Sequence, residues 1–173
     1  MDKGAVVAAI HGLTRSPHWP LAEHHCLKEQ TSCAASGVKE GLQVHHVVPF
    51  HFCILVGRPD LEIDNRNFIV LSESEKGLAE ANYHLLLGHA NDFQSSNLNV
   101  REDVKTFFGM SEAEIKSNTL WLGRVKTRCK AWVDWTVQEK VDFRTMLDNL
   151  YPLAPDQTPE QRLEELVTAL KNK

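Results

Sequence analysis

The fold is decided by two stretches, Leu-Gln-Val-His-His-Val-Val-Pro at residues 42–49 and Phe-Ile-Val-Leu at residues 68–71. Both are rich in apolar and β-branched residues, as short strands are, and Pro49 ends the first of them. Turn signals at residues 57–60 and 64–67 lie in the segment between them, which predicts a loop. The sequence therefore predicts a strand, a loop and a second strand.

Helical patterns surround these strands. One runs from about Pro17 to Glu29, before a polar turn at residues 31–37. A second begins at Ser72 or Ser74, because apolar residues follow at helical spacing: Leu78, Ala81, Leu85 and Leu86. Residues 101–173 predict three or four more helices, two of which start at Ser111 and Thr158.

A stripe of large apolar residues lies in the C-terminal part. Its members fall roughly on one helical face, which favours core packing over a platform for stacking bases. The residues are Trp121, Val125, Trp132, Trp135 and Val141.

Composition and charge limit the classes of function. The chain has 173 residues, 42% of them hydrophobic, which is enough for one domain or one domain with a helical appendage. Lys and Arg number 19 against 23 Asp and Glu, so the formal net charge is -4. Contact with nucleic acid would then need a local basic surface or a bound cation. A local basic run is predicted to be a solvated helix face: Arg124, Lys126, Arg128 and Lys130.

The cysteines and the N-terminal segment predict a cytoplasmic protein. Four scattered cysteines do not form a disulfide framework. The apolar run at residues 5–10 is too short for a secretory signal or a membrane span. We therefore expect a reducing compartment and no membrane partner.

The nine histidines are the first indication of chemistry. Neighbouring side chains on a strand point to opposite faces, so His45 and His46 predict two different roles. One imidazole can hold a metal while the other faces a substrate water, and a histidine on the following helix can complete the metal site. Phosphodiester hydrolysis needs these parts: an activated water, a cation and a base held in the right tautomer.

Three motifs in order resemble the HNH endonuclease family. They are His-His-x-x-Pro, Asp-x-x-Asn-apolar-apolar-x-Leu and His-Leu-x-x-Gly-His, and the similarity extends over about residues 14–100. The most similar variants are small bacterial and phage nucleases with a Pro-Phe-His element, which stands here at residues 49–51. The resemblance implies an α+β fold with a small ββα-metal core, made of a two-stranded hairpin and a helix. Residues 1–100 would form the nuclease domain, and residues 101–173 a helical extension packed on it.

The resemblance also implies a role for each signature residue. His45 and His84 would bind the metal, and His46 would be the general base. Asn67 would orient the base or bind the metal as well. Two further histidines are candidates for contact with metal or phosphate, namely His89 and His51. One divalent cation is implied, Mg²⁺ or Mn²⁺ first and Ni²⁺ or Zn²⁺ next, and DNA is the favoured substrate.

One feature of many relatives is missing. They carry a structural zinc on two cysteine pairs, at positions that fall here at Cys33, Ser36 and near Ser72 and Tyr83. Hydroxyl groups are poor zinc ligands, so a four-thiolate site cannot form at these positions. The sequence predicts no structural zinc, with apolar packing in its place.

Two alternatives to a nuclease stay open. A catalytically degenerate HNH fold, kept as a nucleic-acid-binding or protein-interaction module, would fit the lost cysteines and the acidic net charge. A histidine-rich metal-binding or sensing protein would explain the clustered histidines, but not the asparagine or the order of strands and helix. The sequence also leaves open DNA against RNA and the oligomeric state, although a homodimer would suit an enzyme that cuts both strands.

Overall fold

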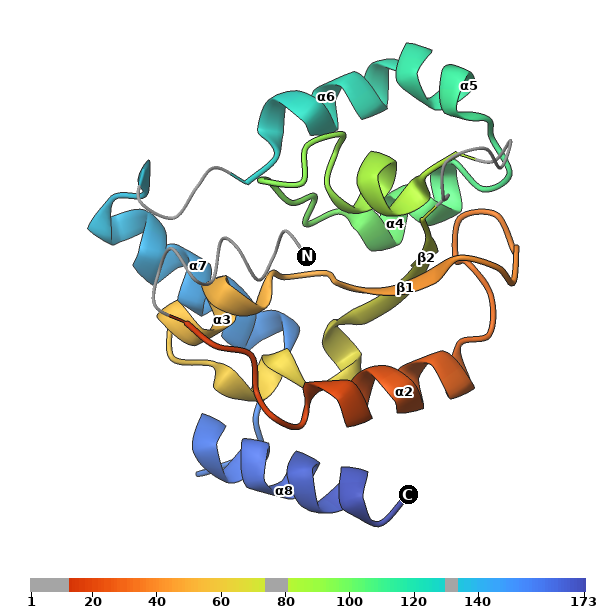
Figure 1. Cartoon of the computed structure of the whole chain (residues 1–173). Helices are drawn as coiled ribbons and strands as arrows, with labels where there is room; N and C mark the ends of the chain where they lie inside the picture. Colours follow the sequence, from red (N-terminus) through yellow and green to blue (C-terminus); the bar gives the residue numbers. More distant parts are fainter. Residues whose placement is uncertain (1–12, 74–80, 130–133) are drawn as a thin grey trace.

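A two-stranded antiparallel sheet lies at the centre of the molecule (Figure 1). The computed structural model describes residues 13–73, 81–129 and 134–173. Strand β1 (Leu42–His46) pairs with β2 (Phe68–Ser72), and the register sets His45 opposite Ile69 and His46 opposite Phe68. The predicted α+β class and pair of strands are confirmed, although β1 ends at His46 and not at Pro49.

The segment between the strands is not the predicted loop. It contains α3 (Phe50–Leu55) and the 3₁₀ turns η1 (Pro59–Glu62) and η2 (Asn65–Asn67). Pro49 stands at the N-terminal cap of α3, where its missing N–H costs nothing, and an apolar run follows it. This run buries Phe50, Phe52 and Cys53 against the body of the protein. The loop prediction was wrong because six residues are too few to reveal a helical period.

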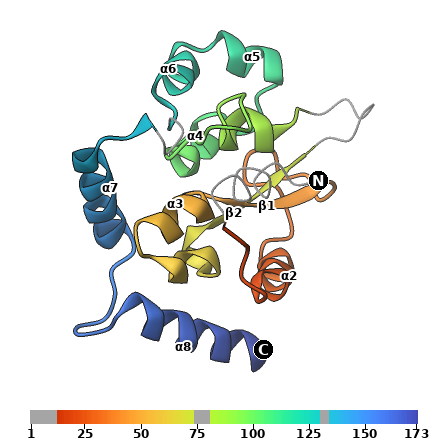
Figure 2. The same ribbon diagram turned by 60° about the vertical axis from the view of Figure 1, so that its left-hand side comes forward.

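Two helices cover one face of the sheet. Helices α2 (Trp19–Glu29) and α8 (Pro159–Lys171) come from opposite ends of the chain and lie next to each other in both views (Figures 1 and 2). Thr158 caps α8 through a reciprocal capping box with Gln161, as its sequence predicted. The core beneath them joins both helices to the strands through Trp19, Ala22, Cys26, Val44, Phe68 and Val70, with Leu163, Leu166 and Leu170 packed against it.

Shorter elements cover the other face. They are the π-helical turn η3 (His84–Gly88), α4 (Val100–Thr106), α5 (Glu112–Ser117) and α6 (Thr119–Thr127). Ser111 caps α5 with Glu114, as predicted. The core on this side includes Cys33, Ile69, Leu71, Leu87, Phe107, Ile115 and Trp121. The helix predicted from Ser72 or Ser74 through Leu78 falls largely on residues 74–80, outside the described residues, and its described end is η3.

A third core joins α7 (Val137–Leu150) to α3. Trp135 packs here against Phe52 and Phe143, whereas Trp121 lies in the core around α4 to α6. The prediction of a single stripe is therefore wrong, because the two tryptophans lie in different cores and Val141 is 53% exposed. The prediction that Trp121 and Trp135 pack in a core is confirmed, and Trp132 lies outside the described residues. The chain leaves α6 at Thr127 before α7 begins, so the two tryptophans never share one helix.

A buried arginine joins the C-terminal part of the chain to the segment between the strands. The Arg58 side chain is fully buried and donates two hydrogen bonds to Asp60, at 2.9 and 2.8 Å. It also donates to Asp148 of α7 and to the backbone oxygen of Tyr151.

No described helix of the chain is both long enough and apolar enough to cross a membrane.

The Arg58 network predicts a large loss of stability on substitution of Asp60. Asp60→Asn leaves a buried guanidinium with half of its countercharge, and we expect it to lower the free energy of unfolding by about 3 kcal/mol. Chemical denaturation measures the change. The control is Glu102→Gln, which breaks an exposed pair with Lys105 and should cost less than about 0.5 kcal/mol. A small, equal loss in both variants would contradict the role given to Asp60.

Candidate functional site

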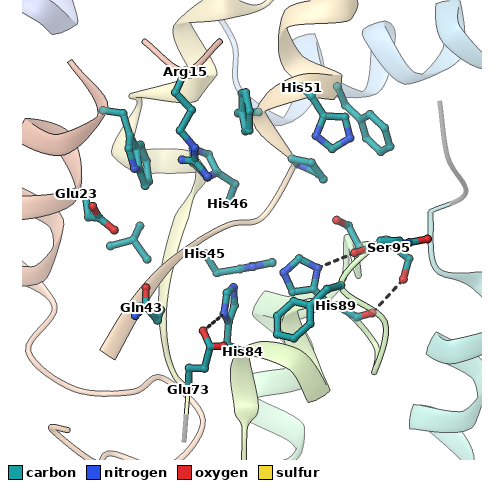
Figure 3. Close-up of a pocket in the computed structure, with 18 residues that line it drawn as sticks. Arg15, Glu23, Gln43, His45, His46, His51, Glu73, His84, His89 and Ser95 are labelled. Carbon is teal, nitrogen blue, oxygen red and sulfur yellow. Dashed lines mark hydrogen bonds and ion pairs between the residues drawn. The ribbon is translucent and has the colours of Figure 1, made fainter. Parts of the chain in front are cut away.

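Three histidines from different parts of the chain form a cluster, called here the three-histidine cluster. His45 belongs to β1, His84 begins η3, and His89 follows it. Each offers one ring nitrogen, and these atoms all lie within 4.8 Å of one another. The three rings face a common centre (Figure 3), with centroids 5.2, 4.9 and 5.0 Å apart. This group could hold a metal ion.

The π-helical turn brings two of the three histidines together. His84 and His89 are five residues apart, and in a regular α-helix such residues point about 140° away from each other. The wider η3 turn (His84–Gly88) places both side chains on one side. The sequence shows the two histidines but not this turn, so it left the place of His89 open between metal and phosphate.

Two members of the three-histidine cluster are oriented through their second ring nitrogen. His84 Nδ1 donates to the Glu73 carboxylate at 3.1 Å, and His89 Nδ1 donates to the Ser95 carbonyl at 2.7 Å (Figure 3). Each contact holds the proton on Nδ1, so the lone pair of the neutral ring is on Nε2. The sequence analysis missed Glu73, because it lies 11 residues from His84 with no helical or strand period between them.

His45 is the buried member of the cluster. The residue is 3% exposed, and its Nε2 has no hydrogen-bond partner among the residues that the structure describes. Burial first, and then the nearby His89 and His84, lower the pKa of His45 well below its ordinary value. The ring is therefore neutral, which is the form that binds a metal. An unpartnered buried nitrogen is costly, and a bound cation would satisfy it.

Gly88 is needed because His45 lies against it. A Cβ at Gly88 would approach three ring atoms of His45 to 2.9, 3.0 and 3.1 Å, closer than side chains normally pack. The requirement comes from this close approach and not from an unusual backbone angle. Sequence analysis noted the glycine within the His-Leu-x-x-Gly-His motif but gave it no role.

His46 lies next to this cluster but is not part of it. The residue is 8% exposed, and its ring contacts Trp19 and Phe68, with centroids 4.5 and 5.2 Å away. Its Nε2 lies 2.9 Å from the backbone oxygen of Glu62. A carbonyl can only accept, so Nε2 carries the proton and the lone pair of the neutral ring is on Nδ1. This is a fixed tautomer, as a general base requires.

The Asn67 side chain holds the backbone that follows His46. Its Oδ1 accepts hydrogen bonds from Val48 N at 2.8 Å and from the Tyr151 hydroxyl at 3.2 Å. Its Nδ2 donates to the backbone oxygens of Val48 and Leu61. Both oxygen lone pairs are thus occupied, which leaves none for a metal. The expected metal-ligand role of Asn67 is corrected: it is a fully buried residue that fixes the chain just after His46.

Tyr151 is a further residue that sequence analysis missed. It lies at the C-terminal end of α7, and its hydroxyl supports the Asn67 amide. Burial raises the pKa of Tyr151 to about 12, so the hydroxyl remains a donor at neutral pH. The contact joins residues 84 positions apart, and no local pattern could have indicated it.

A pocket of about 410 Å³ runs along β1, and both the three-histidine cluster and His46 line it (Figure 3). We call it the histidine pocket. The predicted His51 also lines it, but lies outside the three-histidine cluster. Cys33 is buried in the core, and the absence of a structural zinc stays a prediction. The lining residues used below are Arg15, Trp19, Glu23, His45, His46, Phe50, His51, Glu73, His84 and His89.

The contact of Gly88 with His45 can be tested with a matched pair of substitutions. Gly88→Ala should displace the His45 ring, weaken metal binding and cost about 1–3 kcal/mol of stability. Gly123→Ala is the control: this glycine lies within α6 and a Cβ would meet nothing within 4 Å. The control should keep metal binding, and its free energy of unfolding should rise by up to about 1 kcal/mol. Calorimetric metal titration and thermal unfolding measure both, and equal behaviour of the two variants would contradict the contact.

Stability without metal should fall in acid because of His45. In the unfolded chain this imidazole takes up a proton below pH 6.5, whereas the folded site resists the proton. The unfolded state then binds more protons, so the free energy of unfolding decreases as the pH falls below 6.5, by up to about 1.4 kcal/mol per pH unit. Denaturation in EDTA at several pH values measures the slope. His45→Gln should flatten it and the exposed His24→Gln should not; an unchanged slope in His45→Gln would refute the assignment.

Comparisons with known proteins add no relative to this picture. No protein-family model, no curated protein and no solved structure matches the chain. The resemblance to HNH endonucleases therefore rests on the sequence motifs alone. The function has to be inferred from the pocket itself: three histidines suited to a metal and a fourth with a separate hydrogen bond.

Proposed function

We propose that this chain is a metal-dependent endonuclease of the HNH class, which hydrolyses phosphodiester bonds in nucleic acid, with DNA as the favoured substrate. The observation that carries the proposal is the position of His46 in the same pocket as the three-histidine cluster. A protein that only binds or senses a metal needs the cluster. It does not need a neighbouring imidazole whose tautomer is fixed by a separate carbonyl.

The local architecture supports a ββα-metal core. Strands β1 and β2 and the turn η3 supply the residues of the cluster or hold them in place, in the order that the HNH motif implies. His45 and His46 leave β1 on opposite faces, as the pairing of His45 with Ile69 and of His46 with Phe68 requires. Ile69 belongs to the core beside η3, and Phe68 to the core beneath α2. One strand can therefore serve two functions.

The three histidines favour a different metal ion from Mg²⁺ or Mn²⁺, which the resemblance to HNH endonucleases implies first. His45, His84 and His89 would hold the ion with three neutral imidazoles. Imidazole suits Zn²⁺ and Ni²⁺, whereas Mg²⁺ and Mn²⁺ prefer carboxylate and carbonyl oxygens. We therefore infer Zn²⁺ or Ni²⁺ before Mg²⁺ or Mn²⁺. When bound, such an ion would stabilise negative charge on the phosphate oxygens.

His46 supplies the base. With its Nε2 proton donated to the Glu62 carbonyl, the ring can accept a proton from water at Nδ1. The same carbonyl continues to accept from Nε2 once the ring is charged. Contact with Trp19 and Phe68 keeps the ring from rotating, so little reorganisation accompanies the proton transfer.

Asn67 acts indirectly as a positioning residue. Its backbone oxygen accepts from Val47 N at 2.9 Å and its side chain accepts from Val48 N at 2.8 Å. These two bonds fix the backbone immediately after His46. The role agrees with the expectation that Asn67 orients the base, and not with a role as a ligand.

Nicking of supercoiled plasmid tests the proposal. Purified protein is incubated in EDTA and then with Zn²⁺, Ni²⁺, Mg²⁺ or Mn²⁺. We expect metal-dependent nicking that His46→Ala lowers by about 10² to 10⁴, because a general base is lost. Calorimetry should show that His46→Ala still binds metal, whereas His84→Ala loses metal binding and nicking together. The exposed His24 lies outside the pocket, so His24→Ala is the control and should match the wild type.

The outcomes separate the three readings of the site. Nicking that persists in His46→Ala would contradict the assigned base. No nicking with any metal, together with DNA binding in a gel-shift assay, would favour the degenerate binding module. Metal binding with neither nicking nor DNA binding would favour the metal-binding or sensing protein.

A further inference from the structure

We propose that Arg15 binds a phosphodiester group of the nucleic-acid strand that enters the histidine pocket. The inference rests on the proposed function, since it names the side chain that would hold the substrate of that reaction. Arg15 precedes α2 and lies 30 residues before His45 in the sequence. The fold nevertheless brings it into the pocket that contains the histidines (Figure 3).

Two aromatic rings hold the guanidinium of Arg15. Its central carbon lies 4.6 Å from the centroid of the Trp19 ring and 4.7 Å from that of Phe50. His46 contacts the same two rings, at centroid distances of 4.5 and 6.1 Å. The cation and the assigned base therefore share one wall of the pocket, and a phosphate bound by Arg15 would lie close to His46.

The contact of Arg15 with two aromatic rings suits phosphate recognition. A guanidinium is planar, and aromatic rings contact its flat faces. Its N–H groups carry the positive charge and donate charge-assisted hydrogen bonds to phosphate oxygens. The rings also restrict the side chain before the ligand arrives, which lowers the entropy cost of binding. An ammonium group would supply the charge but not a planar face for the two rings to contact.

The charges around the pocket single out Arg15. Among the described residues that line the pocket, Arg15 is the sole lysine or arginine. Glu23 and Glu73 also line it, and Glu73 is paired with His84. The chain as a whole carries a formal charge of -4, so attraction for a polyanion has to come from a local cation. Arg15 supplies it next to the base.

A buried carboxylate anchors the segment that carries Arg15. Glu62 accepts a hydrogen bond from Ser16 N at 2.7 Å, and the charge of Arg15 acts on the same carboxylate. Glu62 also provides the backbone oxygen that binds His46 Nε2. One residue thus fixes both the base and the chain next to the proposed phosphate-binding side chain, which preorganises their relative positions.

Binding without catalysis tests the assignment. The protein, in EDTA and low salt, is titrated into a fluorescein-labelled single-stranded DNA oligonucleotide, and fluorescence anisotropy gives Kd. Arg15→Gln should weaken binding by about 10- to 100-fold, the effect of losing a charge-assisted hydrogen-bonded pair. Arg15→Lys keeps the charge and should recover part of the loss. Lys126→Gln removes one positive charge from an exposed site on α6 and should stay within about twofold of wild type.

Three results would overturn the inference: wild type that does not bind, Arg15→Gln that binds like wild type, or Lys126→Gln that weakens binding as much as Arg15→Gln. Because no cleavage is involved, a failed nicking assay would leave an Arg15-dependent Kd intact. Conversely, metal-dependent nicking together with a Kd that Arg15→Gln does not change would support the proposed function and contradict this inference.

A second measurement uses the unmodified protein in case Arg15→Gln does not fold. An arginine-selective dicarbonyl reagent is applied with and without the oligonucleotide, and mass spectrometry follows modification of Arg15. We expect the oligonucleotide to slow modification of Arg15 but not of Arg162, which lies on α8 outside the pocket. Equal modification of Arg15 with and without the oligonucleotide would overturn the assignment.

Discussion

The close packing of a buried imidazole on a glycine is the contact on which the site depends. His45 lies against Gly88, where even a single methyl group would collide with its ring. This contact fixes β1 against η3, and with it the distance between His45 and the two histidines at the ends of that turn. A larger residue would separate the strand from the turn. The neutral Nε2 of His45, which has no hydrogen-bond partner in the described part of the chain, is the stability cost of this arrangement.

Strand alternation then divides the work between neighbours. His45 lies on the side of the sheet that η3 and α4 to α6 cover, and His46 on the side covered by α2. Each histidine takes its environment from a different core. A buried ring among other histidines favours a metal ligand, whereas a ring held by a carbonyl and two aromatic side chains favours proton transfer. Two adjacent identical residues therefore have different chemistry.

Sequence patterns predicted the parts of this fold that local interactions determine. The β-branched strands, the Ser111 and Thr158 caps and the histidine positions all depend on neighbours in the chain. Helix α3 was missed because it is short, and the π-helical turn because its period differs from that of an α-helix. The roles of Asn67 and Glu73 depend on partners that only the tertiary structure brings together. A turn asparagine has the same sequence signature whether its amide faces a metal or a backbone.

The hydrogen bond between Tyr151 and Asn67 can form only late in synthesis, because its two residues lie far apart in the chain. Asn67 is translated 84 residues before the hydroxyl that completes its hydrogen bonding, and Arg58 precedes its Tyr151 carbonyl by 93. A nascent chain that has emerged only through α6 already contains the three histidines. Its buried amide and guanidinium still lack these partners. The three histidines are therefore synthesised well before the segment at the end of α7 that completes the hydrogen bonding around their pocket, and α8, which covers α2, is synthesised later still.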